Sequence, residues 1–202
     1  MQSDRAYLDH AATTALLPEA AEAWRDAALI VGNPSSLHTA GRSARRIVEE
    51  GRESIADDLH VRPSEVIFTS GGTEADNLAV KGLAWARPDR PRILCSAIEH
   101  HAVLDPVAWL GEQGRDIDWL PVDAQGRVDP DVVRARLGSD VALCTVMWAN
   151  HEVGTIQPIA EIAAACGEAG VPFHTDAVQA LGQVPVDGCL PGLTSLALSG
   201  HK

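Results

Sequence analysis

The chain has 202 residues, of which 46% are hydrophobic and 22% are charged. This composition excludes a disordered or fibrous protein, and the length suffices for one large domain with a sizeable core. The formal net charge of −12 argues against a nucleic-acid partner, because phosphate binding needs clustered cations. The arginines between residues 42 and 52 alternate with glutamates, which is typical of the solvated face of a helix.

The start of the chain, its apolar runs and its cysteines indicate the cellular compartment. No charged and then apolar leader opens the chain, and no apolar run approaches the roughly 18 residues of a membrane span. We therefore expect a cytoplasmic protein without a membrane partner. The four cysteines form no Cys-x-x-Cys pair, so we expect reduced thiols and neither disulfides nor a metal site. They are Cys95, Cys144, Cys166 and Cys189.

The first third of the chain reads as helical. Residues 7–14 form a short extended segment, and Pro18 starts a helix that ends before the Gly-Asn-Pro-Ser-Ser run at 32–36. A second helix is predicted from about Ser43 to Leu59. Its apolar positions recur every four residues and predict one buried stripe. The stripe comprises Ile47, Gly51, Ile55 and Leu59.

From Glu65 onward, short β-rich runs alternate with helical stretches. Strands alternating with crossover helices imply an α/β fold with a mostly parallel sheet and helices on both of its faces. The predicted helices lie near 74–86, 102–112, 130–137 and 159–169. The predicted strands are Val66–Phe68, Arg92–Cys95, Ile117–Leu120, Val141–Val146, Val171–His174 and Leu196–Leu198.

Ligands gather at the carboxyl ends of parallel strands, so the residues that follow each strand are the candidates for a site. The first strand is followed by Thr69-Ser70-Gly71-Gly72-Thr73-Glu74, which opens a helix. Free backbone N–H groups, a hydroxyl and the positive end of the helix could bind a phosphate there. The alternative is an ordinary helix cap without a ligand.

The other strand ends add side chains of complementary chemistry. Glu99-His100-His101 supplies an imidazole that could stack on a flat ring or move protons, or that could be a solvent-facing loop histidine. Asp176 and Lys202 end two further strands. A lysine that forms a Schiff base and a carboxylate on a pyridine nitrogen suit pyridoxal phosphate. The alternative is a surface lysine and a helix-capping aspartate.

Seven segments, in order along the chain, together resemble the amino-terminal half of a cysteine desulfurase of the NifS/IscS type. These enzymes belong to the class V aminotransferase group of fold-type I pyridoxal-phosphate enzymes, so the resemblance implies the large domain of that fold. The segments are Tyr7-Leu8-Asp9-His10-Ala11-Ala12-Thr13-Thr14, Gly32-Asn33-Pro34-Ser35-Ser36, Phe68-Thr69-Ser70-Gly71-Gly72-Thr73-Glu74-Ala75-Asp76-Asn77, Glu99-His100, Asn150-His151-Glu152-Val153-Gly154, Asp176-Ala177-Val178-Gln179 and Ser199-Gly200-His201-Lys202.

The resemblance also implies roles for single residues. Lys202 would hold pyridoxal phosphate as a Schiff base, Asp176 would pair with the ring nitrogen, and His100 would stack on the ring. The family pattern Asn-Asn-Glu is Asn-His-Glu here, and an imidazole lacks the paired donor and acceptor of an amide. The resemblance places Gly72, Thr73, Ser199 and His201 on the phosphate, Gln179 and His151 on the ring hydroxyl, and Asn33 and His151 near the substrate.

The implied activity is removal of sulfur from L-cysteine, which yields L-alanine and an enzyme persulfide. The implied partners are a sulfur acceptor or Fe–S scaffold protein and, at full length, a second copy of the chain. Two alternatives stay open. One is a selenocysteine lyase or another class V enzyme, and the other is a catalytically inactive fragment that acts as a binding or dimerising module.

The resemblance further implies a domain division. Residues 1–20 would be an N-terminal segment that packs with a small domain, and residues 21–202 an incomplete cofactor-binding large domain. Family members carry a nucleophilic cysteine and a substrate-binding arginine well beyond the lysine that corresponds to Lys202. We therefore expect the chain to be truncated before the C-terminal small domain. Alone, residues 1–202 should bind pyridoxal phosphate weakly, release no alanine or sulfide from cysteine, and aggregate.

Overall fold

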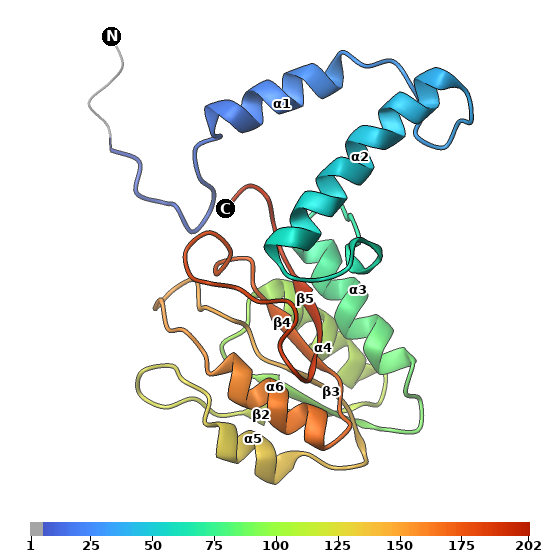
Figure 1. Ribbon diagram of the computed structural model, residues 1–202. Coiled ribbons are helices and arrows are strands. Elements are labelled where there is room, and N and C mark those ends of the chain that lie inside the picture. The colour runs from blue at the N-terminus through green and yellow to red at the C-terminus, as the bar shows by residue number, and fades with distance from the viewer. Residues whose placement is uncertain (1–5) are drawn as a thin grey trace. The chain divides into compact units, whose positions relative to one another are not determined.

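The computed structural model describes residues 6–202 in two compact units (Figure 1). The first unit comprises the described residues up to Phe68 together with His201, and the second comprises residues 69–200 together with Lys202. The predicted domain boundary after residue 20 stays a prediction, and its residues 1–5 lie outside the described residues. Within 6–202, no helix is long and apolar enough to cross a membrane.

The first unit is helical, as predicted. Helix α1 spans Pro18–Ala28 and begins at a proline, whose missing N–H costs nothing at the first helical position. Helix α2 spans Thr39–Asp58 and starts four residues before the predicted Ser43. The earlier start has a local cause, because Nδ1 of His38 accepts the N–H of Gly41 at 3.3 Å and caps the helix.

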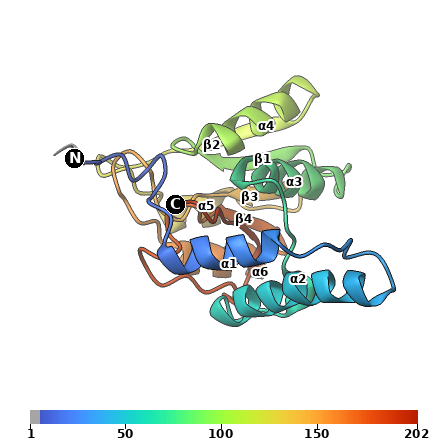
Figure 2. The same ribbon diagram turned by 90° about the horizontal axis from the view of Figure 1, so that it is seen from above.

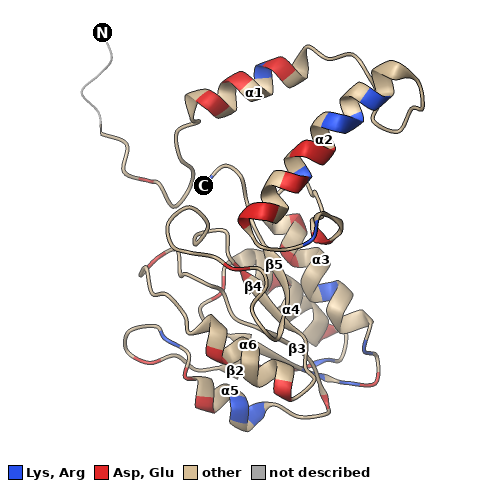
Figure 3. Ribbon diagram, in the orientation of Figure 1, with Lys and Arg blue, Asp and Glu red and all other residues tan. Residues whose placement is uncertain are grey.

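The predicted stripe on α2 is only partly right. Leu59, just after the helix, is buried and Ile47 and Ile55 are half-buried, but Gly51 is exposed. The charged face is confirmed, since bases gather in the first half of α2 and acids mainly in the second half (Figure 3). The ion pairs are Arg45–Glu49 at 3.9 Å, Arg46–Glu50 at 3.6 Å and Arg52–Glu49 at 3.0 Å.

The predicted strand Val66–Phe68 is wrong. This segment follows a short 3-10 helix, η1 (Pro63–Glu65), and belongs to no strand of the described chain. Its backbone bonds to a side chain and not to a neighbouring strand, because Arg52 donates a hydrogen bond to the carbonyl of Val66. The Arg52 guanidinium also lies 4.7 Å from the centre of the Phe68 ring. An apolar β-branched run therefore stays extended here without joining a sheet.

The second unit contains a five-stranded parallel sheet in the order β2-β1-β3-β4-β5. The predicted parallel α/β fold is confirmed. Strands β4 and β5 are displaced by a few residues from their predicted bounds, because hydrogen bonding to neighbouring strands sets where a strand ends. The strands are β1 (Arg92–Ser96), β2 (Asp116–Leu120), β3 (Val141–Thr145), β4 (Phe173–Asp176) and β5 (Leu193–Ala197).

Helices cover both faces of the sheet. Helices α3 and α4 lie together on one side, and α6 lies on the other (Figure 2). Under α3 and α4, the strands contribute an apolar core that includes Ile93, Cys95 and Leu143. Burial on both faces explains why β1 and β3 read as largely apolar runs. The helices are α3 (Gly72–Trp85), α4 (His101–Glu112), α5 (Pro130–Arg136) and α6 (Ile159–Glu168).

Candidate active site

The strand order predicts where a ligand would bind. The chain leaves β1 toward β2 and leaves β3 toward β4, so the connections diverge between the neighbouring strands β1 and β3. In open α/β sheets, ligands bind outside the carboxyl ends of the strands at such a point. Glu99 and His100 follow β1, and Asn150 and His151 follow β3, so four residues of the sequence motifs lie at this edge.

Gly72 brings the start of α3 close to two other strand ends. A Cβ atom built on Gly72 would lie 3.0 Å from Cγ2 of Val178 and 3.7 Å from Cβ of Ser199. A larger residue would therefore crowd the Val178 side chain, so Gly72 lets the start of α3 lie close to the segments that follow β4 and β5. No side chain caps α3, although Ser70 already donates its N–H to Glu74 at 2.5 Å. The first turn of α3 thus presents backbone donors that suit an anion beside Thr73 and Ser199.

Asp176 is the last residue of β4 and is only 5% exposed. Its Oδ1 accepts the N–H of Val178 at 2.8 Å, and its carbonyl accepts the N–H of Trp148 at 2.8 Å. Burial, and next the charge of Asp76, raise the pKa of the Asp176 carboxyl to about 6. A buried carboxylate without a strong cationic partner favours a ligand that brings positive charge.

Lys202 lies close enough to two predicted site residues to change their titration. Its positive charge lowers the pKa of Asp176, against the larger effect of burial. The same charge contributes to the lowered pKa of His100, after burial and His151. Lys202 itself is half-buried. Lys202 therefore lies close enough to Asp176 and His100 for its charge to act on both.

His100 and His151 face each other edge to face, with ring centroids 5.1 Å apart and planes at 74°. Nδ1 of His100 accepts the N–H of Ala102 at 3.0 Å, so a neutral His100 carries its proton on Nε2. Nδ1 of His151 is buried and has no hydrogen-bond partner among the described residues. An orphaned polar atom of this kind indicates a ligand contact at His151.

Glu99, which precedes His100, is 4% exposed. One carboxyl oxygen accepts the hydroxyl of Ser96 and the N–H of Met147, each at 2.6 Å. The other oxygen has no partner in the described part of the chain. Burial is the main cause that raises the pKa of Glu99 to about 8, so the residue is protonated at neutral pH.

The described contacts give no role in the site to three of the predicted residues. Asn33 and His201 belong to the first unit. Oδ1 of Asn33 accepts the N–H of Ser35 at 2.9 Å, and the carbonyl of His201 accepts the N–H of Thr14 at 3.0 Å. Gln179 is half-buried in the second unit, shortly after Asp176. The roles of Asn33, His201 and Gln179 stay predictions.

Sequence reasoning assigned no role to a buried polar group beneath Asp176. His174 donates toward Oδ1 of Asp76 at 3.1 Å through Nε2, and its Nδ1 lies 2.9 Å from Oγ of Ser195. Asp76 and His174 are 1% and 0% exposed. A signal was present, since Asp76 precedes Val80 and Ala84 at four-residue spacing and so lies on the buried face of α3.

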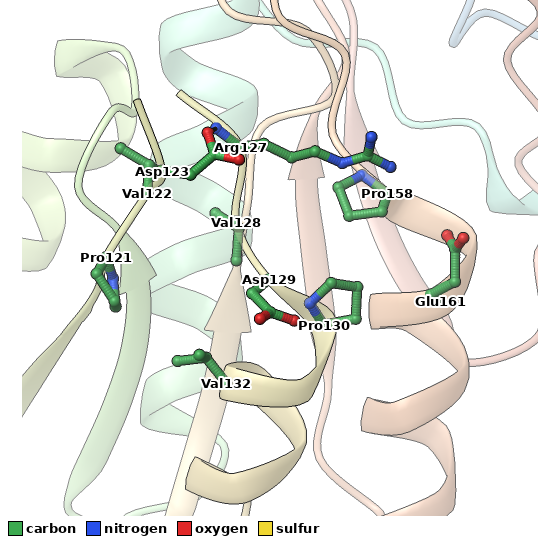
Figure 4. A pocket seen from close by; sticks show the side chains of 10 residues that line it. All are labelled: Pro121, Val122, Asp123, Arg127, Val128, Asp129, Pro130, Val132, Pro158 and Glu161. Atoms are coloured by element: carbon green, nitrogen blue, oxygen red, sulfur yellow. Dashed lines mark hydrogen bonds between the residues drawn. The ribbon is translucent and has the colours of Figure 1, made fainter. Parts of the chain in front are cut away.

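A pocket of about 550 Å³ lies elsewhere, between the starts of α5 and α6 (Figure 4). The side chain of Arg127 reaches across it toward Pro158. None of its lining residues is a predicted site residue, so it is separate from the candidate active site. In the described part of the chain, no group of three histidine, cysteine or acidic residues is arranged to hold a metal. The pocket is lined by Pro121, Val122, Asp123, Arg127, Val128, Asp129, Pro130, Val132, Pro158 and Glu161.

Comparison with known proteins agrees with this geometry. Residues 6–202 match the family described as aminotransferase class-V. The chain is 57% identical to an "IscS-like cysteine desulfurase" of Mycobacterium tuberculosis, over 98% of the chain and 52% of the relative. It is 46% identical to "Cysteine desulfurase IscS" of Dictyoglomus turgidum, over 97% of the chain and 50% of the relative.

A solved structure described as "SspA in complex with cysteine" superposes with a TM-score of 0.92 at 35% identity, covering 96% of this chain and 57% of that one. The chain thus spans about half the length of the relatives that it matches.

Proposed function

Because the chain belongs to the aminotransferase class-V family, we propose that it is the cofactor-binding part of a pyridoxal-phosphate-dependent cysteine desulfurase. The observation that carries the proposal is the buried carboxyl of Asp176, whose pKa burial raises to about 6 against the opposing charge of the nearby Lys202. A lysine and a buried acid are the two groups that this cofactor requires. The names of the relatives supply the reaction, sulfur removal from L-cysteine.

The described residues fit pyridoxal phosphate at three points. The uncapped first turn of α3, which Gly72 allows to approach Ser199, suits the phosphate. The buried carboxyl of Asp176 suits a protonated ring nitrogen. The unpartnered Nδ1 of His151 suits a hydroxyl on the ring.

When bound, pyridoxal phosphate supplies an electron sink for negative charge at the α-carbon of an amino acid. In this proposal Lys202 holds the cofactor covalently, and Asp176 keeps the ring nitrogen protonated. His100 lies against the ring with its proton on Nε2, since Nδ1 is occupied by the N–H of Ala102. Gly72, Thr73, Ser199 and His201 bind the phosphate, Gln179 and His151 the ring hydroxyl, and Asn33 and His151 contact the substrate.

Sulfur transfer requires a nucleophilic thiolate. The thiolate attacks the sulfur of cysteine, the Cβ–S bond breaks, and its electron pair passes to carbon, which takes up a proton as alanine leaves. Cys95, Cys144 and Cys166 are buried. Burial raises the pKa of Cys95, and a hydrogen bond with Cys166, together with burial, raises that of Cys144. Because the resemblance implies a nucleophile well beyond Lys202, we propose that it is none of the four cysteines, the exposed Cys189 included.

The compartment, oligomeric state and partners are proposed as well. We propose that the complete protein is a cytoplasmic homodimer. We further propose that it acts on L-cysteine and passes sulfur to an acceptor or Fe–S scaffold protein. An activity assay with L-selenocysteine in place of L-cysteine distinguishes the alternatives, because a selenium-specific lyase acts on L-selenocysteine alone, whereas a desulfurase acts on L-cysteine.

A matched pair of variants tests the proposal, because the sequence contains only two lysines, Lys81 and Lys202. The full chain that the gene encodes is mixed with pyridoxal phosphate and reduced with borohydride. We expect Lys202→Ala to abolish the visible absorbance band, the trapped adduct and alanine release. Lys81→Ala is the control and should keep all three, since Lys81 lies 5.0 Å from the Trp109 ring and bonds Asn77 at 2.8 Å. An adduct on Lys81 would contradict the proposal.

A further inference from the structure

The polar group beneath Asp176 is built around His174. Residues two apart on a strand point to the same face of a sheet, so His174 lies directly beneath Asp176 on the face that α3 covers. The register pairs His174 with Ser195 on β5, and α3 contributes Asp76. Both ring nitrogens therefore have a partner, Asp76 at 3.1 Å and Ser195 at 2.9 Å.

The chemistry of these partners orients the imidazole. An ionised Asp76 only accepts, so Nε2 of His174 carries a proton and donates it. The Ser195 hydroxyl can donate to Nδ1 or accept from it. The second oxygen of Asp76 is buried without a partner among the described residues, so His174 is the hydrogen-bonding neighbour of this carboxylate.

We propose that Asp76 and His174 are positioning residues that set, with opposite sign, how readily Asp176 carries the negative charge that binds the cofactor ring. The inference rests on the proposed function, because it assigns the cationic ring nitrogen to Asp176. It goes beyond that function by assigning a role to two residues that would not touch the cofactor. The opposite sign follows from charge, since Asp76 disfavours a second carboxylate nearby and His174 favours one.

Other groups also act on Asp176, and they come from each neighbouring element. Lys202, beyond β5, favours the charged form of Asp176. For Glu99, beyond β1, burial is the main cause of its raised pKa, and the charge of Asp176 raises it further. Cys144 of β3 points to the opposite face of the sheet, because its neighbour Thr145 is the residue paired with His174. All of these groups stay unchanged when Asp76 or His174 is replaced, so variants isolate the two contributions.

The probe for the test is 4′-deoxypyridoxine 5′-phosphate. It retains the ring nitrogen and the phosphate but has no aldehyde, so it cannot react with Lys202. Its dissociation constant is measured on the full chain from about pH 5 to about pH 8, where affinity should fall about tenfold per unit below the pKa of Asp176. Titration of the probe's own phosphate is common to all variants, and each profile is normalised to its value at the highest pH.

The two variants should move the normalised profile in opposite directions. At the lowest pH, we expect His174→Gln to bind at least about threefold more weakly than the unmodified protein. Asp76→Asn should bind at least about threefold more tightly on the same scale. Ser195→Ala removes a hydrogen bond of the same group without changing charge, and its normalised profile should superpose on that of the unmodified protein.

A merely structural role predicts losses of affinity that are equal at all pH values. Superposed profiles, or shifts of both variants in the same direction, would therefore overturn the inference. Failure of the unmodified protein to bind the probe at any pH would instead overturn the proposed function. If a variant does not fold, NMR of ¹⁵N-labelled histidine in the unmodified protein decides. A proton on Nε2 of His174 supports the inference, and a bare Nε2 contradicts it.

Discussion

The two edges of the parallel sheet carry charged clusters of opposite character. At the amino edge, Arg92 binds Asp140 through two hydrogen bonds of 2.9 and 3.0 Å, and Asp118 through one of 3.1 Å. These groups are partly exposed, and each acid has an arginine partner. The Arg92 hydrogen bond lowers the pKa of Asp140, and the Asp140 hydrogen bond raises that of Arg92.

At the carboxyl edge three acids, Asp76, Glu99 and Asp176, are at least nine-tenths buried. Burial raises the pKa of Glu99 to about 8 and that of Asp176 to about 6. The acids of the amino edge have an arginine partner, whereas burial disfavours the charged form of Asp176 at the carboxyl edge. In the proposed function, a cationic ring nitrogen would favour that charged form.

Replacing one carboxylate at each edge by an amide should give the largest difference in cofactor affinity. In the proposed function, Asp176→Asn removes the partner of a buried cationic ring nitrogen, so we expect cofactor binding to weaken by roughly 3–5 kcal/mol. Exchange of the substrate α-proton should nearly cease. Asp140→Asn, at the amino edge, should leave both properties unchanged. The measurement is titration with pyridoxal phosphate, and equal affinities for the two variants would show that the edges do not differ in function.

The pH dependence of stability sharpens the comparison. Because the pKa of Glu99 is about 8 in the folded protein and 4.5 ordinarily, the folded state keeps a proton that the unfolded state loses. Stability of the cofactor-free protein should therefore fall as pH rises from about 4.5 to about 8, by at most about 1.4 kcal/mol per unit from this residue.

Glu99→Gln should flatten that slope, because its amide can still accept from Ser96 and Met147 but cannot ionise. Urea unfolding at several pH values measures it. Asp140 provides the contrast, since its lowered pKa gives stability that is lost only as pH falls below its ordinary value of 3.8. An unchanged slope in Glu99→Gln would mean that Glu99 is ionised in the folded protein.

The smallest effect is expected from Arg92→Leu at the amino edge. It removes two partly exposed ion pairs, so the free energy of unfolding should fall by about 1 kcal/mol. Affinity for pyridoxal phosphate should stay the same. The same urea and titration measurements apply, and a large loss of cofactor affinity would show that the two edges are coupled through the sheet.

Much of the site could be predicted because its residues lie next to regular elements. A strand read from a β-rich run also indicates which residue follows it, so His100 and Asp176 were assigned to the carboxyl edge from local pattern alone. The turn at Gly71-Gly72-Thr73 predicted a helix near 74–86, and α3 begins two residues earlier, at Gly72. The strand Val66–Phe68 was predicted wrongly, because local propensity does not indicate whether a run finds a neighbour to pair with.

The sequence by itself determined the alternation of strands and helices, the α/β class and the segments that identify the family, because each depends on residues close together in the chain. The tertiary structure decided the rest. Asp76 and His174 meet across 98 positions and His174 and Ser195 across 21, which only the packing of α3 on the sheet and the pairing of β4 with β5 bring about. The raised pKa of Glu99 likewise arises mainly from burial. Burial depends on every element that covers Glu99, so no single segment of the sequence predicts it.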